Sequence, residues 1–341
     1  MKAGYKLLIA IAICIVALAA AIGIGSVSIG PGEIINIMGN KLFGTPLSSE
    51  ISSLTADILW KIRLPRAIMA FLVGGALAVS GTVMQSVLRN PLASSYTLGV
   101  SSGASLGAAI VILAGGTMTF LGMFTLPLVG FVFGLATVFL AMGFAAKLDR
   151  NMENHTIILV GMVLSLFVNA ILTMITALSQ EHLQQLIFWQ MGSFSSMDWS
   201  QVAIVLGVLL VCMVVLMRYT QEMDIMTFGE EQALSAGVEL KKVKFLLIAT
   251  SALLTGTAVA FVGTIGFIDL IAPHVVRKVF GSSHRWLVPI SAVFGGIFMV
   301  IADLLSRTVL APQELPVGAV TALVGAPFFA YVYFKKKKKA V

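Results

Sequence analysis

From Lys61 to Gly107 the chain has the sequence KIRLPRAIMAFLVGGALAVSGTVMQSVLRNPLASSYTLGVSSGASLG. Its first apolar run, Ala67 to Leu88, carries no charge, and the break Arg89-Asn90-Pro91 separates it from a second run rich in Gly, Ala and Ser. About 20 apolar residues in a helix cross the hydrocarbon core of a bilayer. The stretch therefore predicts a membrane-spanning helix, a sharp break and the start of a second one. Because small residues let helices approach closely in lipid, we expect these helices to pack against protein.

The composition of the whole chain indicates a protein that uses lipid as its solvent. Hydrophobic residues make up 58% of the 341 residues, charged residues make up only 11%, and the mean hydropathy is +1.01. These values are far from those of soluble domains. The net charge of +7 lies in short clusters between apolar runs, without the interleaved aromatic residues of a nucleic-acid-binding face. We therefore expect an all-α, polytopic membrane protein in the lipid bilayer, with no nucleic-acid partner.

Apolar runs and charged loops predict about ten transmembrane helices in a single transmembrane domain, residues 1–341. The first follows Lys6 and ends near Ile29; it resembles a signal peptide but is longer than the apolar core of one. Two more fill the uncharged interval between Asn90 and Lys147, with a turn near Gly115-Gly116. Besides Ala67–Leu88, the other predicted spans are Thr156–Ser179, Gln201–Met217, Phe245–Thr264, a short one through Pro273, Trp286–Leu305 and Val317–Phe334.

Positive charge is expected on the cytoplasmic side of a membrane. Lys2 and Lys6 near the N-terminus, and Lys335 to Lys339 near the C-terminus, therefore predict that both termini are cytoplasmic. In this topology the segment from Gly30 to Lys61 is an external loop with short helical pieces. The segment from Gln180 to Ser200 is an interfacial segment at the external surface.

A weak internal repeat is visible at an offset of 182 residues. Residues 70–99 and 252–281 share ten identities in 30 positions without a gap, including Pro91 and Pro273. The repeat halves would cover roughly 61–200 and 243–334, and five spans between the copies make the second inverted, as in proteins that open alternately to either side. Since proline lacks the N–H that a helix interior needs, the two prolines are expected at equivalent helix starts or breaks.

The sequence lacks the motifs of an enzyme. It has no Gly-Lys dipeptide, hence no phosphate-binding loop, and no His-Glu-x-x-His zinc motif. Cys14 and Cys212 lie alone in apolar runs, and the four histidines are far apart, which favours structural hydrogen bonding. We therefore expect no enzyme activity, no catalytic residue, no metal and no cofactor.

Two aspartates lie within predicted spans, where a charge at the bilayer centre costs at least about 2.5–3.5 kcal/mol. Asp303 stands four residues before Arg307, a spacing that lets the two side chains pair on one helix face. Asp269 has no cation in helical register except the distant Arg277, and its neighbours in the sequence do not explain it.

Several short motifs follow one another from Arg63 to Phe329: RLPR, RNPLA, LGVSSGA, GFI-x-LIAPHVVR, ADLLSR and ELPVG-x-VTALVGAPFF. In this order they resemble the permease subunits of the ABC importers for iron-siderophores, haem and cobalamin. The sequence departs from the family pattern at Asp269, where that family commonly has glycine. The difference concerns the packing at this helix break or a local substrate preference.

The resemblance implies a permease subunit that moves an iron-siderophore, haem or cobalamin-type chelate into the cytoplasm across the bacterial inner (cytoplasmic) membrane. It implies three partners: cytoplasmic ABC ATPase subunits, a second permease copy or a paralogue, and an extracytoplasmic substrate-binding protein. An ion-coupled secondary transporter is the alternative. Such a transporter would use membrane carboxylates or broken helices around an ion site, for which Asp269 is the unpaired candidate.

The charged stretch of residues 219–243 is predicted to be the coupling loop, which receives the ATPase subunits in similar permeases. Gly229 can end one turn, Glu230 and Glu231 suit the start of a short helix, and an apolar face follows. The predicted coupling residues are Gly229, Glu230, Glu231, Ala233, Leu234, Ala236, Gly237 and Val238, of which Ala233, Leu234 and Val238 form the apolar face. A solvated loop whose lysines only set the topology is the alternative.

The predicted topology places Arg63, Arg66 and Arg307 at the external surface, where positive charge is disfavoured. Arginines of these motifs face acidic side chains of the binding protein in similar permeases, and a guanidinium group can bind a carboxylate through two parallel hydrogen bonds. We therefore expect these three arginines to form the docking patch for the binding protein. Anchoring to lipid phosphate, together with the Asp303 pair for Arg307, is the alternative.

Overall fold

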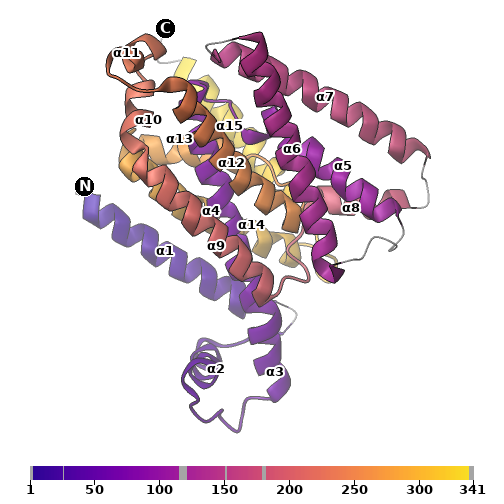
Figure 1. Cartoon of the computed structure of the whole chain (residues 1–341). Coiled ribbons are helices and arrows are strands. Elements are labelled where there is room, and N and C mark those ends of the chain that lie inside the picture. The colour runs from indigo at the N-terminus through magenta and orange to yellow at the C-terminus, as the bar shows by residue number, and fades with distance from the viewer. Residues whose placement is uncertain (1–2, 26, 115–120, 150–151, 179–181, 338–341) are drawn as a thin grey trace.

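Helices account for every regular element in the described part of the chain. The computed structural model describes residues 3–25, 27–114, 121–149, 152–178 and 182–337 (Figure 1). Its helices form a bundle with α11 (Glu230–Ser235) at one end and α2 (Pro31–Phe43) and α3 (Ser53–Asp57) at the other. These are called the α11 end and the α2 end below. The predicted all-α class is confirmed.

The long helices are α1 (Ala3–Gly23), α4 (Leu64–Val87), α6 (Thr125–Leu148), α7 (Asn154–Leu178), α9 (Trp199–Arg218), α12 (Leu240–Val262), α14 (His284–Thr308) and α15 (Val317–Lys337). Shorter helices between them are α5 (Val100–Leu113), α8 (Leu183–Met191), α10 (Thr220–Met226) and α13 (Ile268–Phe280). A π-helical segment, η1 (Ile58–Arg63), leads from α3 directly into α4. The 3-10 turns η2 (Ser95–Leu98) and η3 (Gly122–Phe124) precede α5 and α6.

Six helices of the described chain are long and apolar enough to cross a membrane, which makes the chain a multi-pass membrane protein. They cover Ser53–Val87, Gly122–Leu148, Asn154–Leu178, Trp199–Arg218, Leu240–Val262 and His284–Thr308. Shorter apolar helices lie at Leu8–Gly23, Val100–Leu113 and Val317–Tyr331, where the sequence also predicts spans. The turn predicted near Gly115-Gly116 lies outside the described residues.

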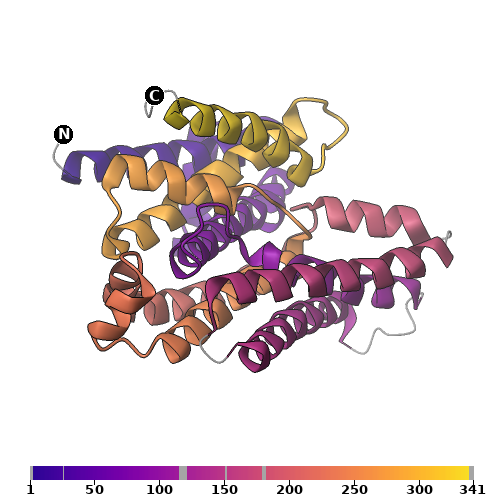
Figure 2. The ribbon, with the colours of Figure 1, turned by 90° about the horizontal axis from the view of Figure 1, so that it is seen from above.

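The central helix of the bundle is α4, and 89% of its most apolar window is buried inside the protein. It packs against α12, α13 and, most extensively, α14 (Figure 2). A Cβ atom at Gly74 would lie 2.3 Å from the backbone oxygen of Gly295, and a Cβ atom at Gly295 would lie 2.3 Å from that of Gly74. The two helices therefore meet backbone to backbone. This confirms the expectation that the small residues of this span pack against protein.

The two prolines that the repeat pairs occupy different positions. Pro91 lies in the turn after α4, whereas Pro273 is the sixth residue of α13. The matched glycines differ as well, because Gly263 ends α12 with φ +77°. Gly81 lies inside α4, where a Cβ atom would be 1.9 Å from the backbone oxygen of Asp269. The expected equivalence of the two prolines is therefore wrong at this register, because one lies in a turn and the other lies inside a helix. The inverted arrangement of the halves stays a prediction.

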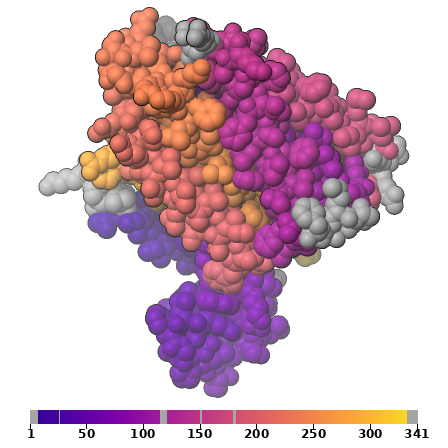
Figure 3. All heavy atoms as spheres, viewed as in Figure 1, coloured from indigo at the N-terminus to yellow at the C-terminus, as the bar shows by residue number. Residues whose placement is uncertain are grey.

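A small unit projects from the α2 end of the bundle (Figure 3). It contains α2 and α3, which confirms the short helical pieces predicted for residues 30–61. Apolar side chains on α2 are open to the surroundings, among them Ile35 at 72% and Phe43 at 82% exposure. Because η1 connects this unit to α4, the unit places Arg63 at this end of the bundle.

Candidate functional site

The predicted coupling loop forms two short helices, α10 and α11, at the α11 end (Figure 1). Gly229 lies between them with φ +139°, a backbone conformation that favours glycine. Glu230 and Glu231 open α11, where acidic side chains meet the positive end of a helix. Ala236 and Gly237, the latter with φ +83°, turn the chain toward α12. The predicted short helix and its start are therefore confirmed.

The apolar face predicted for this segment is present only in part. Ala233 is fully buried and Val238 is 9% exposed, but Leu234 is 59% exposed. Neighbouring residues of a helix point about 100° apart, so Ala233 and Leu234 cannot both face the bundle. Leu234 and the nearby Phe228, which is 75% exposed, instead present apolar surface outward. That surface is available to another protein.

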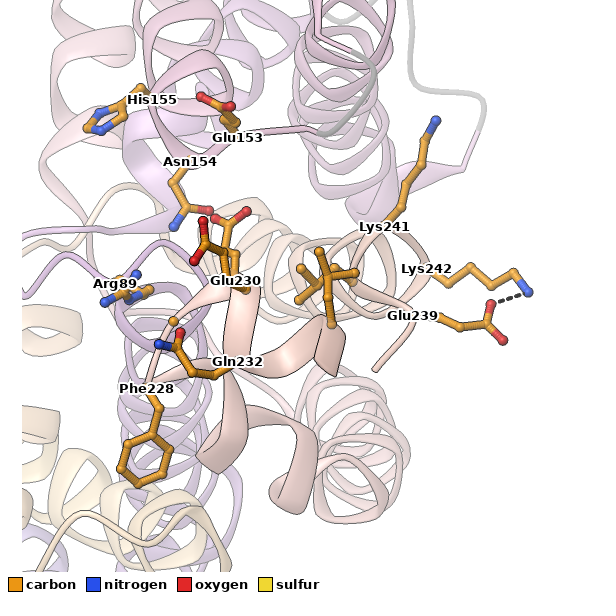
Figure 4. Close-up of a pocket in the computed structure, with 14 residues that line it drawn as sticks. Arg89, Glu153, Asn154, His155, Phe228, Glu230, Gln232, Glu239, Lys241 and Lys242 are labelled. Atoms are coloured by element: carbon orange, nitrogen blue, oxygen red, sulfur yellow. Dashed lines mark ion pairs between the residues drawn. The ribbon is translucent and has the colours of Figure 1, made fainter. Parts of the chain in front are cut away.

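A hollow of about 960 Å³ opens beside α11 (Figure 4). Its lining carries charges of both signs, including Arg89 from the end of α4, Glu153 from the loop before α7, and Glu230. Lys241 and Lys242 line it from the start of α12. Small-molecule sites are mostly apolar and enclosed. This open, charged hollow is therefore better suited to contact with a protein surface.

Lys244, in the second turn of α12, is fully buried and contacts the coupling loop. Its ammonium group donates to Glu230 Oε1 and to the backbone oxygen of Met152, each at 2.9 Å. A buried lysine needs such partners because an unpaired charge inside a protein is costly. These contacts connect α11 to α12 and to the loop before α7. Lys244 lies three and four residues before the buried Leu247 and Ile248, so helical spacing puts all three on the inner face of α12. The charged residues next to Lys244 obscure this signal in the sequence.

His284, the first residue of α14, connects α10 to α4 and is 1% exposed. Its Nδ1 lies 2.5 Å from Asp224 Oδ1, and its backbone N–H donates to the same oxygen at 2.9 Å. Its Nε2 lies 2.5 Å from Ser86 Oγ on α4. The structural hydrogen bonding predicted for the histidines is thus confirmed for His284. Its partners could not be identified from the sequence because they lie on two other helices.

The hydrogen bonds continue from α4 into α13. Arg277 Nη2 approaches Ser86 Oγ at 3.4 Å, and Arg277 Nη1 donates to Gln85 Oε1 at 2.6 Å. Gln85 Nε2 in turn donates to the backbone oxygen of Asp269 at 3.1 Å. Pro273 has no N–H to donate to this oxygen, which therefore needs a partner from another helix. A connected set of hydrogen bonds thus runs from α10 to the first turn of α13.

Asp269 itself is 3% exposed and lies in the first turn of α13. Its Oδ2 accepts a hydrogen bond from Ser94 Oγ in the turn before η2. The carboxylate also accepts from its own backbone N–H and from that of Leu270, and the positive end of the helix favours a carboxylate here. These contacts explain the aspartate that the sequence leaves unexplained. They also join the break after α4 to the break after α12.

Arg63 and Arg307 meet at the carboxyl end of α1. Arg63 is 6% exposed and donates to the backbone oxygens of Ile22 at 3.0 Å, Gly23 at 3.1 Å, and Val27. Arg307 donates to those of Ile24, at 2.7 Å, and Ala21. The last carbonyl groups of a helix have no partners within that helix. The two guanidinium groups bind such carbonyl groups at Ala21, Ile22 and Gly23, and two more just after the helix, and so connect this end of α1 to η1 and α14.

Arg66 binds two acidic side chains. It donates to both oxygens of Asp303 at 2.9–3.1 Å and to the two oxygens of Glu314 at 2.8 and 3.0 Å. The Asp303 side chain is 2% exposed, whereas that of Glu314 is 43% exposed. Arg307 lies 3.6 Å from Asp303. The helical pair predicted from the sequence is therefore present, but Arg66 is the closer partner.

The three arginines thus gather at one end of the bundle, but they are not an open patch. All three guanidinium groups are bound within the chain, by the carbonyl groups of α1 or by Asp303 and Glu314. The Asp303 pair given as an alternative for Arg307 is present, and the sequence does not reveal the other internal partners. Docking of the binding protein at these arginines stays a prediction. A carboxylate of a partner protein would have to replace one of the groups that bind the arginines within the chain. Glu314 is the exposed acid among these groups.

Ser86, His284 and Asp224 lie in the order of a nucleophile, a base and an acid, but their geometry does not suit hydrolysis. Ser86 is 4% exposed, and its hydroxyl donates to the backbone oxygen of Thr82 at 2.9 Å. It is therefore not free to attack a substrate. Within the described residues, no group of three or more His, Cys, Asp or Glu side chains could hold a metal ion.

Comparison with known proteins identifies the family. The profile of the FecCD transport family matches residues 13–335. The ABC transporter permease protein YvrB of Bacillus subtilis is 39% identical over 305 residues, covering 89% of this chain and 86% of that protein. The cobalamin import system permease protein BtuC of Halobacterium salinarum is 36% identical, covering 88% and 79%. The solved structure of a metal-chelate type ABC transporter in an inward-facing conformation has a TM-score of 0.85 and 28% identity, covering 97% and 99%.

These matches extend over nearly the whole chain, in agreement with the motifs found between Arg63 and Phe329. Permease subunits are transport components without enzymatic activity of their own. The chain belongs to the FecCD transport family and is an ABC importer permease.

Proposed function

We propose that this chain is the membrane subunit of an importer for a metal chelate of the iron-siderophore, haem or cobalamin type. The observation that carries the proposal is the family match over residues 13–335. Relatives are named for cobalamin, hemin and Fe(3+) dicitrate, and one is named for molybdate. Three of these four cargoes are metal complexes with organic ligands, which favours a chelate over a simple oxyanion.

The permease is proposed to cross the inner membrane ten times. Besides the six long apolar helices, α1, α5 and α15 supply three crossings and α13 supplies a short one. The 13 residues of α13 extend about 20 Å, less than the roughly 30 Å of the hydrocarbon core. Its first turn would then lie inside the bilayer, next to Ser94. Ten crossings put both termini on one side, and their lysines favour the cytoplasm.

Separate ATPase subunits are proposed to bind at the α11 end, because the chain has no phosphate-binding loop of its own. The exposed Leu234 and Phe228 would supply apolar contacts to these subunits. Lys244 holds α11 against α12, and His284 holds α10 against α4. A force applied to this segment would therefore reach the spanning helices.

An external binding protein is proposed to deliver the chelate at the α2 end. An acidic side chain of that protein would replace Glu314 on Arg66, because Glu314 is exposed while Asp303 is not. Arg63 and Arg307 would support the site by holding the end of α1 in place. The three arginines thus keep a role in docking, with Arg66 as the group that contacts the partner.

Pairing with a second copy or a paralogue is also proposed, with the cargo path between the two permeases. Only 22% of the apolar window of α7 is buried within the chain. Leu166 and Phe167 on this helix are 70% and 62% exposed. Such a face offers apolar area for a second permease.

The proposal is tested by transport in liposomes that contain this permease with the ATPase and the binding protein encoded beside it. Ferric siderophores, haemin, cobalamin and molybdate are each supplied on the side of the binding protein. ATP is supplied on the side of the ATPase. ATP-dependent accumulation of one chelate is the expected result. Accumulation of molybdate alone would overturn the substrate class. Uptake driven by an ion gradient without ATP would instead support a secondary transporter.

A further inference from the structure

We propose that His284 is a positioning residue that transmits the position of α10 to α4, and through α4 to the break at the start of α13. The inference rests on the proposed function, because it requires ATPase subunits bound at the α11 end. It adds a specific route from that end into the interior of the bundle. Beyond the contact of His284 with α4, the route runs through hydrogen bonds of Arg277 and Gln85 to which the proposed function assigns no role.

The first step of the route is the attachment of α10. This helix of seven residues packs against α4, α9, α11 and α14 (Figure 1). Met223 and Met226 bury their side chains, and Asp224 between them accepts two hydrogen bonds from His284. A displacement of α11 by a bound subunit therefore reaches α10, and Asp224 is its polar attachment to α14.

The second step is the ring of His284, which is engaged on both sides. Nδ1 contacts Asp224 and Nε2 contacts Ser86, each at 2.5 Å. A ring with two engaged nitrogens between two helices cannot follow one partner without moving the other or losing a hydrogen bond. Losing it is costly, because a buried polar group without a partner bears its full desolvation penalty. Apolar side chains can slide past one another, but this contact cannot.

The third step leads from α4 to the break. Arg277 contacts both Ser86 and Gln85, and Gln85 donates to the backbone oxygen that Pro273 leaves free on Asp269. Gly81 brings α4 into backbone contact at the same point. Here the route ends at the first turn of α13, beside the break after α4. Movement of α10 is thus expected to shift this turn.

The experiment measures how many chelate molecules are transported per ATP hydrolysed by the reconstituted complex. Wild type must first transport; if it does not, the proposed function fails and not this inference. His284→Asn retains a donor toward Asp224 but is too short to reach Ser86. Asp224→Ala removes the acceptor, whereas Asp224→Asn keeps an oxygen at the same place. We expect His284→Asn and Asp224→Ala to lower the transport per ATP on the order of fivefold, and Asp224→Asn to retain most of it.

His182→Asn, at the start of α8, is the matched control and should leave the ratio unchanged. The double variant Asp224→Ala/Ser86→Ala should lose no more than the larger single loss, because both substitutions interrupt one route. If His284→Asn fails to assemble with the ATPase, Ser86→Ala tests the same contact with the loss of one hydroxyl. A wild-type ratio of transport to hydrolysis in assembled Asp224→Ala and Ser86→Ala complexes would overturn the inference. Equal loss in Asp224→Asn would also overturn it, because the hydrogen bond would then not be the cause.

Discussion

Gln85 Nε2 lies 3.1 Å from the backbone oxygen of Asp269, so that a side chain of α4 completes the hydrogen bonding of α13. In an uninterrupted helix this oxygen would accept from the N–H four residues later, but that residue is Pro273. The glutamine is therefore the substitute for a missing helical hydrogen bond. Its other end accepts from Arg277, so one amide satisfies two groups at the helix crossing.

Gln85→Ala is expected to destabilise the permease by about 1–3 kcal/mol, because it leaves the buried carbonyl of Asp269 without a partner and removes one of the acceptors of Arg277. The free energy lost should be partly recovered in Gln85→Ala/Pro273→Ala, which restores the helical N–H. Thermal unfolding in detergent measures both effects. Gln184→Ala, on the exposed surface of α8, is the control. No recovery in the double variant would mean that Gln85 does not replace the missing hydrogen bond.

Gly74→Ala should destabilise the contact between α4 and α14, since the new Cβ atom would lie 2.3 Å from the backbone oxygen of Gly295. Relief of such an overlap requires the helices to separate, which costs typically about 1–3 kcal/mol in a packed core. Gly143→Ala on α6 is the matched control, because no atom lies within 4 Å of its Cβ position. There we expect a slight stabilisation from helix propensity. Similar melting temperatures for the two variants would contradict the close contact.

Substitutions of Glu230 and of Lys244 should lower the stability of the permease by unequal amounts. Glu230→Gln leaves the fully buried ammonium group of Lys244 without a negative charge beside it, facing only neutral oxygens such as the Met152 carbonyl, whereas Lys244→Met leaves Glu230, which is 29% exposed. Breaking a buried pair costs about 3–5 kcal/mol when the remaining charge stays buried. We therefore expect Glu230→Gln to lower the melting temperature more than Lys244→Met. Lys242→Met, which breaks an exposed pair with Glu239, should change stability by less than about 1 kcal/mol.

The fold class and the positions of the spans could be predicted from the sequence because the bilayer imposes a simple rule. Apolar runs of about 20 residues must form helices, since no water satisfies the backbone there. Leu64–Val87, Asn154–Leu178 and His284–Thr308 accordingly lie within a few residues of their predicted positions. The Gly- and Ala-rich composition likewise indicated close helix contacts, as seen between Gly74 and Gly295.

The polar pairs inside the bundle could not be predicted, because they join residues that are far apart in the sequence. Arg66 and Asp303 are separated by 237 positions, and Ser86 and His284 by 198. Helical spacing indicates pairs within one helix only, so the sequence pointed to Arg307 as the partner of Asp303. For the same reason the internal partners of Arg63 and Arg66 were not expected. The carbonyl groups that bind Arg63 belong to the end of α1, and a sequence does not show which helix end lies beside which side chain.

Leu234→Glu should weaken binding of the ATPase subunits and leave the fold intact, because this side chain is 59% exposed on α11. The same substitution at Ala233, which is fully buried, would disturb the permease itself and is therefore a poor test. Leu54→Glu, on α3 at the opposite end and 69% exposed, is the matched control. Co-purification of the ATPase with each variant is the measurement. Normal recovery of the ATPase with Leu234→Glu would contradict docking at this surface.

Arg66 and Glu314 provide the test for docking of the binding protein. Arg66→Ala should weaken binding modestly and mainly in the association rate, since the exposed Glu314 site contributes only about 0.2–1 kcal/mol. It should also lower thermal stability, because the buried Asp303 loses its closer partner. Glu314→Gln should strengthen binding, because it weakens the internal partner that an incoming carboxylate must replace. Both effects on binding should diminish as salt is raised. Arg63→Ala should lower thermal stability as well, through the loss of its contacts to the end of α1. Lys61→Ala, a side chain 65% exposed near the same end, is the control for charge alone. Binding is measured with reconstituted permease across ionic strength, and weaker binding by Glu314→Gln would show that the binding protein does not take the place of Glu314 on Arg66.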